Sequence, residues 1–141
     1  ERDYLRELAE ELGVAERVRW LGWVEEVTSL LPAADVYACV SRTEGMPNSV
    51  LEALAAGVPV VGTDIPALRE LCDGGRRLHL LQSDSPVEIA AGVRRVLAGG
   101  RWVDEMIDAA LRWARRSLDP SEAARQLVAL YERILAARPA R

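Results

Sequence analysis

The amino-acid sequence predicts an α/β fold: a Rossmann-like, doubly wound parallel sheet of about four strands, followed by extra C-terminal helices. Two patterns predict this fold. In the first part of the chain, short apolar runs alternate with segments whose apolar residues recur at helical spacing, which is typical of strands joined by crossover helices. After about residue 81 the short runs stop, and three longer amphipathic segments follow.

Four short apolar segments are predicted to be strands. Residues 18–22 (VRWLG) are bulky and end at a glycine, which favours a strand that stops there. The runs at 36–40 and 58–63 are apolar without alternation, as expected for strands that are covered on both faces. The fourth run, at 78–81, follows a glycine turn.

Seven segments have the spacing of helices. In the first of them Leu5, Leu8 and Leu12 share one face, and Gly13 ends the helix. The second is short because it meets Pro32. In chain order the predicted helices span 3–12, 25–31, 49–56, 66–72, 86–98, 102–117 and 121–137.

The first predicted helix starts the sequence, with no strand before it. In a parallel sheet such a helix normally crosses over from a preceding strand. We therefore expect residues 1–141 to form a single partial domain, whose first strand and helix precede this sequence.

The composition of the chain indicates which kinds of partner it can bind and in which compartment it is found. The net charge is −4, so we expect no nucleic-acid binding, which requires a basic surface. All 18 basic residues are Arg. Cys39 and Cys72 lack a CxxC spacing and a neighbouring His, which predicts buried free thiols, no metal site and a reducing cytoplasm. No apolar stretch is long enough to span a bilayer, so we expect no transmembrane segment.

The segment 41–64 (SRTEGMPNSVLEALAAGVPVVGTD) carries the candidate site. Its loop follows a predicted strand and opens a helix, the position at which α/β sheets bind ligands. Backbone N–H groups at 48–51 and the helix dipole suit a phosphate. Gly45 either turns the chain with a positive φ or allows a ligand to approach the backbone. Glu44 and Glu52 would flank the phosphate, and carboxylates accept hydrogen bonds from vicinal sugar hydroxyls. The arrangement suits a nucleotide sugar.

Each of these residues also has a purely structural interpretation. Ser49 and Glu52 have the spacing of a capping box, in which Glu52 accepts from the Ser49 backbone N–H. Glu44 fits a solvated loop charge, and Gly45 with Pro47 fits an ordinary turn.

Two longer segments resemble the group 1 glycosyltransferases, which are the retaining GT-B enzymes of family four. EGMPNSVLEALAAGVPVVGTDIPALRE resembles their E-x7-E region, and RVRWLGWVEEVTSLLPAADVYACVS upstream is similar to their base-binding turn and the strand after it. Nearly the whole chain falls within the family's C-terminal, donor-binding domain. The resemblance implies transfer of a sugar from a nucleoside diphosphate sugar to an acceptor hydroxyl, with retention.

The resemblance also implies roles for individual residues. Glu44 would be the catalytic residue and would contact hydroxyls of the transferred sugar. Glu52 would hold the ribose hydroxyls. The remaining donor contacts would come from the base-binding turn and from the loop and helix N-terminus, namely Gly22, Trp23, Val24, Gly45, Met46, Asn48, Ser49 and Val50. Trp23 equally fits packing at the end of its strand.

The family needs no metal or other cofactor for the donor phosphate. Its phosphate-binding basic pair and its acceptor-binding N-terminal domain would both precede residue 1, so the chain alone is expected to be inactive or a weak nucleotide binder. We expect a cytoplasmic protein, peripheral at the membrane if the N-terminal domain places it there. Two alternatives stay open: a noncatalytic module that binds a nucleotide or a partner protein, and another GT-B enzyme such as a nucleotide-sugar epimerase.

Overall fold

A parallel three-stranded sheet forms the centre of the computed structural model, which describes residues 2–137. The strands β1 (Tyr37–Cys39), β2 (Val60–Thr63) and β3 (His79–Leu81) lie in the order β1-β2-β3. Tyr37 is opposite Val60, and Val61 is opposite His79. Because all three strands run the same way, their carboxyl ends meet at one edge of the sheet. The parallel sheet of the sequence prediction is confirmed.

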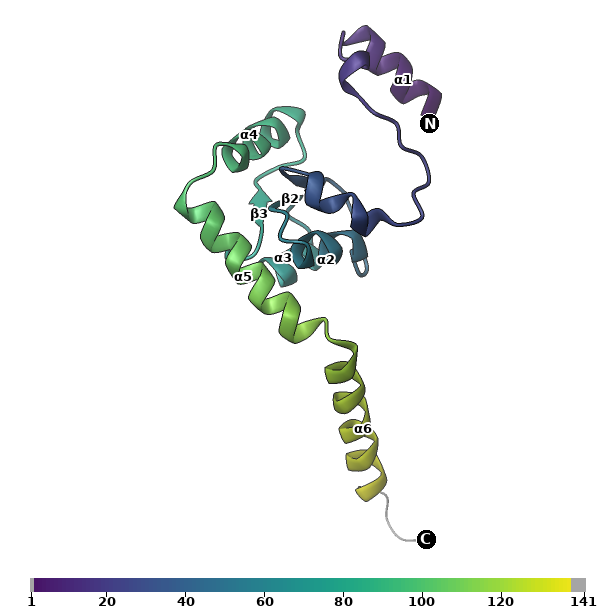
Figure 1. Ribbon diagram of the computed structural model, residues 1–141, viewed down its shortest axis with the longest axis vertical. Helices are drawn as coiled ribbons and strands as arrows, with labels where there is room; N and C mark the ends of the chain where they lie inside the picture. The colour runs from purple at the N-terminus through teal and green to yellow at the C-terminus, as the bar shows by residue number, and fades with distance from the viewer. Residues whose placement is uncertain (1, 138–141) are drawn as a thin grey trace.

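Helices cover both faces of this sheet (Figure 1). Consecutive residues of β2 point to opposite faces: Val60 packs in the cluster with α2 (Asn48–Ala55) and α3 (Pro66–Cys72), and Val61 in the cluster with α4 (Pro86–Leu97). Further along the chain, α5 (Arg101–Ser117) contributes to both clusters. The fold is therefore a three-layer, doubly wound arrangement.

Two glycines allow helices to lie close to the sheet. A Cβ at Gly62 of β2 would be 2.6 Å from Leu68 Cδ1, on α3. A Cβ at Gly92 of α4 would collide with Leu81 Cδ2, on β3. Neither glycine has a positive φ, so the backbone conformation does not require glycine at these positions. Both are needed because a larger side chain would collide with its neighbours.

The prediction of a strand at 18–22 is wrong, and the sheet has three strands where about four were predicted. Residues 18–24 have no regular secondary structure and pair with no strand in the described chain, and most of them are exposed. Bulky residues favour a strand only where a neighbouring strand supplies hydrogen bonds, and local sequence does not reveal that neighbour.

The helix predicted at 25–31 is also wrong, because two 3-10 turns, η2 (Val27–Ser29) and η3 (Leu31–Ala33), occupy that region. Pro32 lies within η3 and removes a hydrogen-bond donor there. The other six predicted helices are confirmed, and a further 3-10 turn, η1 (Ala15–Arg17), follows the first of them.

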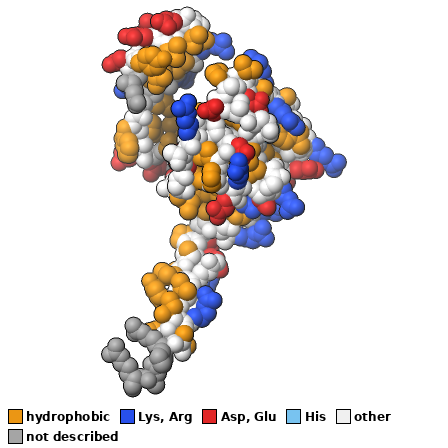
Figure 2. Space-filling model, turned by 180° about the vertical axis from the view of Figure 1, so that it is seen from behind, with side chains coloured by type: hydrophobic (Ala, Val, Ile, Leu, Met, Phe, Trp, Pro, Cys, Tyr) orange, Lys and Arg blue, Asp and Glu red, His pale blue; other side chains and the backbone are white. Residues whose placement is uncertain are grey.

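The first and last helices lie outside the packed body (Figure 1). In α1 (Arg2–Glu11) only Ala9 is buried, and α6 (Pro120–Ala136) has no buried residue. Apolar side chains gather along α6 in the space-filling view (Figure 2). The exposed apolar residues of this helix include Tyr131 and Leu135. Within residues 2–137, no helix combines the length and the apolar character that crossing a membrane requires.

Both cysteines are buried free thiols, as predicted. The Cys72 thiol lies at the end of α3, where it accepts from the Gly75 N–H at 3.0 Å and donates to the Leu78 carbonyl at 3.4 Å. Burial raises the pKa of the Cys72 thiol, so it stays protonated and serves as a donor.

His79 in β3 makes stability depend on pH. Burial, and secondarily the positive charge of Arg95, lower the pKa of His79 below its ordinary value. Below about pH 6.5 the unfolded chain takes up a proton that the folded chain resists, so the free energy of unfolding should fall as the pH drops. Urea unfolding between pH 7.5 and 5.5 measures this slope, which His79→Gln should reduce. An equal slope in both proteins would contradict the assignment, because His79 is the only histidine in the sequence.

Candidate functional site

The loop between β1 and α2 carries Glu44 at the carboxyl edge of the sheet. Ser41 Oγ donates to Glu44 Oε1 at 2.6 Å, and the carbonyl of Ser41 accepts from Thr63 Oγ1 at 2.5 Å. Thr63 is buried at the end of β2, whereas Glu44 is exposed. Two hydrogen bonds therefore connect the fixed end of a core strand to a solvent-facing carboxylate.

The N-terminus of α2 is less open than the sequence predicts. Pro47 is its N-cap residue, and the Pro47 carbonyl accepts from the N–H groups of Val50 and Leu51 at 2.9 and 3.1 Å. The Asn48 N–H donates to the Met46 carbonyl at 2.9 Å. Of the four predicted amides, Ser49 alone has no backbone acceptor among residues 2–137. Ser49 thus offers the most accessible N–H to an anion, in the positive field of the helix dipole.

Glu52 does not form the capping box that the spacing allowed. The helix begins at Asn48, which places Ser49 inside it, and the Pro47 N-cap has no side-chain hydrogen bond. Glu52 lies in the second turn of α2 and is half-buried, and the buried residues around it include Val50 and Ala53. The structural alternative for Glu52 is therefore wrong.

The structure also distinguishes the two interpretations of Gly45. Its φ is not positive, so the turn does not require glycine for its backbone conformation. A Cβ built on Gly45 meets no atom within 4 Å, so the space above this residue is open. Close approach of a ligand to the backbone is the interpretation that agrees with this geometry.

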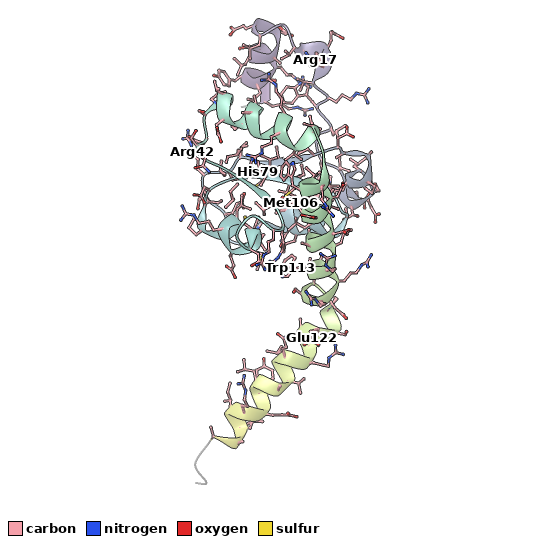
Figure 3. All side chains as sticks on the ribbon, turned by 90° about the vertical axis from the view of Figure 1, so that its left-hand side faces the viewer. Arg17, Arg42, His79, Met106, Trp113 and Glu122 are labelled. Carbon is pink, nitrogen blue, oxygen red and sulfur yellow. The ribbon has the colours of Figure 1, made fainter. Side chains whose placement is uncertain are left out.

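Two cavities lie on either side of the Glu44 loop. One, of about 250 Å³, is bounded by Gly45, Met46 and Pro47, by Glu70 on α3 and by Trp113 on α5. Trp113 is labelled in Figure 3. The other, of about 380 Å³, lies at the carboxyl ends of all three strands. The second will be called the strand-end cavity, and the residues that line it are Ser41, Arg42, Thr63, Asp64, Ile65, Arg69, Gln82, Ser83 and Asp84.

A charged pair forms one wall of the strand-end cavity. Arg69 Nε and Nη2 lie 2.5 and 3.0 Å from the two carboxylate oxygens of Asp64. The hydrogen bonds from Arg69 lower the pKa of Asp64, so this carboxyl stays ionised at neutral pH. Across the cavity Arg42 Nε lies 3.4 Å from Asp84 Oδ2. The cavity is thus lined by both signs of charge, next to Ser41 and Glu44.

The sequence prediction missed Ser41, Thr63, Asp64 and Arg69. The Ser41–Glu44 contact had a local signal, since a serine three residues before a loop carboxylate is well placed to donate to it. The Thr63–Ser41 bond joins residues 22 apart and depends on the pairing of β1 with β2. No pattern within either segment predicts that bond.

The predicted base-binding turn is not brought to this site. Gly22 has a φ of +69°, and Trp23 is 94% exposed, so Trp23 does not pack at a strand end. Neither cavity beside the Glu44 loop includes Gly22, Trp23 or Val24. In the described part of the chain, no three His, Cys, Asp or Glu residues are grouped as a metal would require.

Known proteins similar to this chain are sugar transferases. The family model "Glycosyl transferases group 1" matches residues 1–99. A D-inositol 3-phosphate glycosyltransferase of Corynebacterium urealyticum is 36% identical over 129 residues, which cover 90% of this chain and 30% of that protein. A lipopolysaccharide core biosynthesis glycosyltransferase of Rhizobium meliloti is 46% identical over 63 residues, which cover 45% of this chain and 18% of that protein. The chain thus spans a third or less of the length of these relatives.

Solved structures show the same fold. An Anabaena protein in complex with UDP and glucose superposes with a TM-score of 0.82 at 24% identity, over 93% of this chain and 37% of that one. A sucrose-phosphate synthase from Thermosynechococcus elongatus gives 0.80 at 24% identity, over 97% of this chain and 35% of that one. With the family match over residues 1–99, the chain belongs to the group 1 glycosyltransferases and has the fold of a C-terminal domain of the GT-B class.

Proposed function

We propose that this chain is the donor-binding half of a retaining hexosyltransferase. It would bind a nucleoside diphosphate sugar, whose sugar passes to the hydroxyl of an acceptor molecule that the protein's N-terminal domain binds. The observation that carries the proposal is the Glu44 carboxylate, held by Ser41 beside the N-terminus of α2. A carboxylate that accepts from sugar hydroxyls and a helix terminus that receives phosphate are here a few residues apart.

The proposed contacts follow from the positions of the groups. The diphosphate would approach the Ser49 N–H, with the backbone of Gly45, Met46, Asn48 and Val50 beside it. Only the backbone of Val50 is available, because its side chain is fully buried. Glu44 would accept from the sugar and Glu52 from the ribose.

The base would require the turn at Gly22, Trp23 and Val24 to move toward α2. That movement is part of the proposal, since the turn now lies away from the site and Trp23 is 94% exposed. An exposed indole can stack on a base without first giving up other contacts.

Charge stabilisation by the protein would take the place of a metal. The leaving diphosphate would gain negative charge in the transition state, and amides at a helix N-terminus oppose that charge without reorganising. We propose that no metal or other cofactor is required. Retention would follow from attack on the face that the diphosphate leaves, with the departing phosphate taking the acceptor proton.

The comparisons support the class of donor and the role in glycan synthesis. The Anabaena structure of similar fold contains UDP and glucose. One relative is a D-inositol 3-phosphate glycosyltransferase, and another is a glycosyltransferase of lipopolysaccharide core biosynthesis. The buried free thiols of Cys39 and Cys72 agree with a reducing compartment, and we propose a cytoplasmic protein, peripheral at the membrane if its N-terminal domain places it there.

Calorimetry with UDP, GDP and ADP sugars tests donor binding. One of these donors should bind the chain, and Glu52→Gln should weaken it roughly tenfold or more, because the ribose hydroxyls lose a charged acceptor. Glu132→Gln, at an exposed position of α6, is the matched control and should leave binding unchanged. Binding that is equal in both variants would remove Glu52 from the site. The absence of binding to every donor would favour a noncatalytic module.

A further inference from the structure

A third pocket lies along the outer edge of β3. It has a volume of about 480 Å³ and is lined by Arg69, Gly75, His79, Gln82, Arg95 and Trp102, with four smaller or apolar neighbours. It will be called the edge pocket. His79, at its floor, is labelled on the sheet beneath α4 in Figure 3. Neither Glu44 nor Glu52 borders it.

The charge of the edge pocket is unusual for an acidic protein. The sequence has 22 acidic and 18 basic residues, yet the described residues that line this pocket include two arginines and a histidine and no Asp or Glu. Asp64 offsets the charge of Arg69. No ion pair engages Arg95 within residues 2–137, so the positive charge of Arg95 is left for a ligand.

Aromatic contacts hold the cationic wall in place. Arg95 Cζ lies 5.3 Å from the centroid of the Trp102 ring, in a cation–π contact. The His79 ring meets the same indole edge-on, at 5.9 Å between centroids and 68° between planes. A guanidinium stacked on a ring keeps its N–H fork in a fixed plane, which favours bidentate contact with an oxyanion.

The turn after α3 forms one side of the pocket, which Gly74 and Gly75 line. Helical Cys72 is followed by Asp73 and Gly74, with φ values of 51° and 65°, and then by Gly75 at 91°. A right-handed residue followed by left-handed ones turns successive amides toward one side, the geometry of an anion-binding concavity. One of these amides, that of Gly75, donates to Cys72 Sγ.

We propose that the edge pocket binds a compact phosphorylated small molecule, with Arg95 as its principal contact and Trp102 as its flat wall. The edge pocket shares Arg69 and Gln82 with the strand-end cavity, but it includes none of the proposed donor-binding residues, and the proposal does not depend on donor binding. A phosphate is favoured over a carboxylate because its additional oxygens can accept from an arginine fork and from a glutamine amide at once.

The pKa of His79, the only histidine of the chain, can be used to measure binding in the edge pocket. Glu88 and Arg95 of α4 are the charged groups that act on the His79 pKa, in opposite directions. A bound phosphate would stabilise the charged imidazolium, so we expect a saturable rise in the pKa of His79 when inorganic pyrophosphate or a hexose phosphate is added to the chain. Proton NMR of the His79 ring at a series of pH values measures this rise.

Two neighbouring arginines supply the test and its control. Arg95→Gln should weaken pyrophosphate binding roughly tenfold or more and should raise the pKa of His79 in the free chain. Arg94→Gln removes the same charge from the same turn of α4 but lies outside the pocket lining, and it should leave binding unchanged. A pKa change that does not saturate, that NaCl reproduces at equal ionic strength, or that is the same in both variants would overturn the proposal.

Discussion

Replacing Glu44 by alanine is expected to lower kcat/KM for sugar transfer by roughly a hundredfold to a thousandfold, the range found when one preorganised transition-state contact is removed. The Glu44 carboxylate would bind hydroxyls of the sugar as its ring gains positive charge, and alanine offers no acceptor. The measurement is steady-state transfer in the full-length, two-domain enzyme of our proposal, with the donor identified by calorimetry.

Two further variants make the Glu44 result specific. Ser41→Ala removes the 2.6 Å hydrogen bond that orients Glu44 but leaves the carboxylate, so its effect on kcat/KM should be smaller than that of Glu44→Ala. Binding of the nucleoside diphosphate without its sugar should be the same in Glu44→Ala and in the wild type. Unchanged transfer in Glu44→Ala would exclude this residue from the site.

The largest effects on stability are expected where Gly62 meets Leu68. Leu68 is fully buried, so Leu68→Ala should cost about 2–5 kcal/mol of unfolding free energy. Gly62→Ala should cost about 1–3 kcal/mol, because its Cβ would lie 2.6 Å from Leu68 Cδ1. The double variant should lose less than the sum of the two, since the alanine methyl at 62 enters space that the leucine has left. Urea unfolding of the four proteins measures this coupling.

Gly45→Ala is the matched control for the stability experiment. It adds the same methyl group at a position where nothing lies within 4 Å, so the free energy of unfolding should change little. If the two core substitutions proved additive, the close approach of α3 to β2 at Gly62 would be contradicted.

The parts of the fold that local sequence specifies were predictable. Gly57 and Pro59 lie between α2 and β2 and mark the end of the helix in the sequence. Pro66 is the first residue of α3, a position at which proline is favoured. Residues 18–22 have strand-like side chains as well, but a strand also needs a neighbour. Pairing between distant segments is the information that the local pattern lacks.

The candidate site also has features that the local sequence predicts and features that depend on the folded structure. The spacing of Glu44 and Glu52 and the position of the loop before a helix could be read from the sequence. The role of Ser49 could not, because the choice between N-cap and helix interior depends on whether the helix begins at 48 or 49. The Thr63–Ser41 bond required the folded sheet, since it links the ends of two strands.

The two carboxylates of the candidate site are held by different parts of the fold. Glu44 is fixed to the end of β2 through Ser41 and Thr63, whereas Glu52 moves with α2, whose Val50, Ala53 and Leu54 are seated in the core. The packing of α2 on the sheet therefore determines the distance between the carboxylates of Glu44 and Glu52. If both glutamates bind the donor as we propose, a substitution beneath this helix would alter the length of donor that fits between them, although neither glutamate is changed.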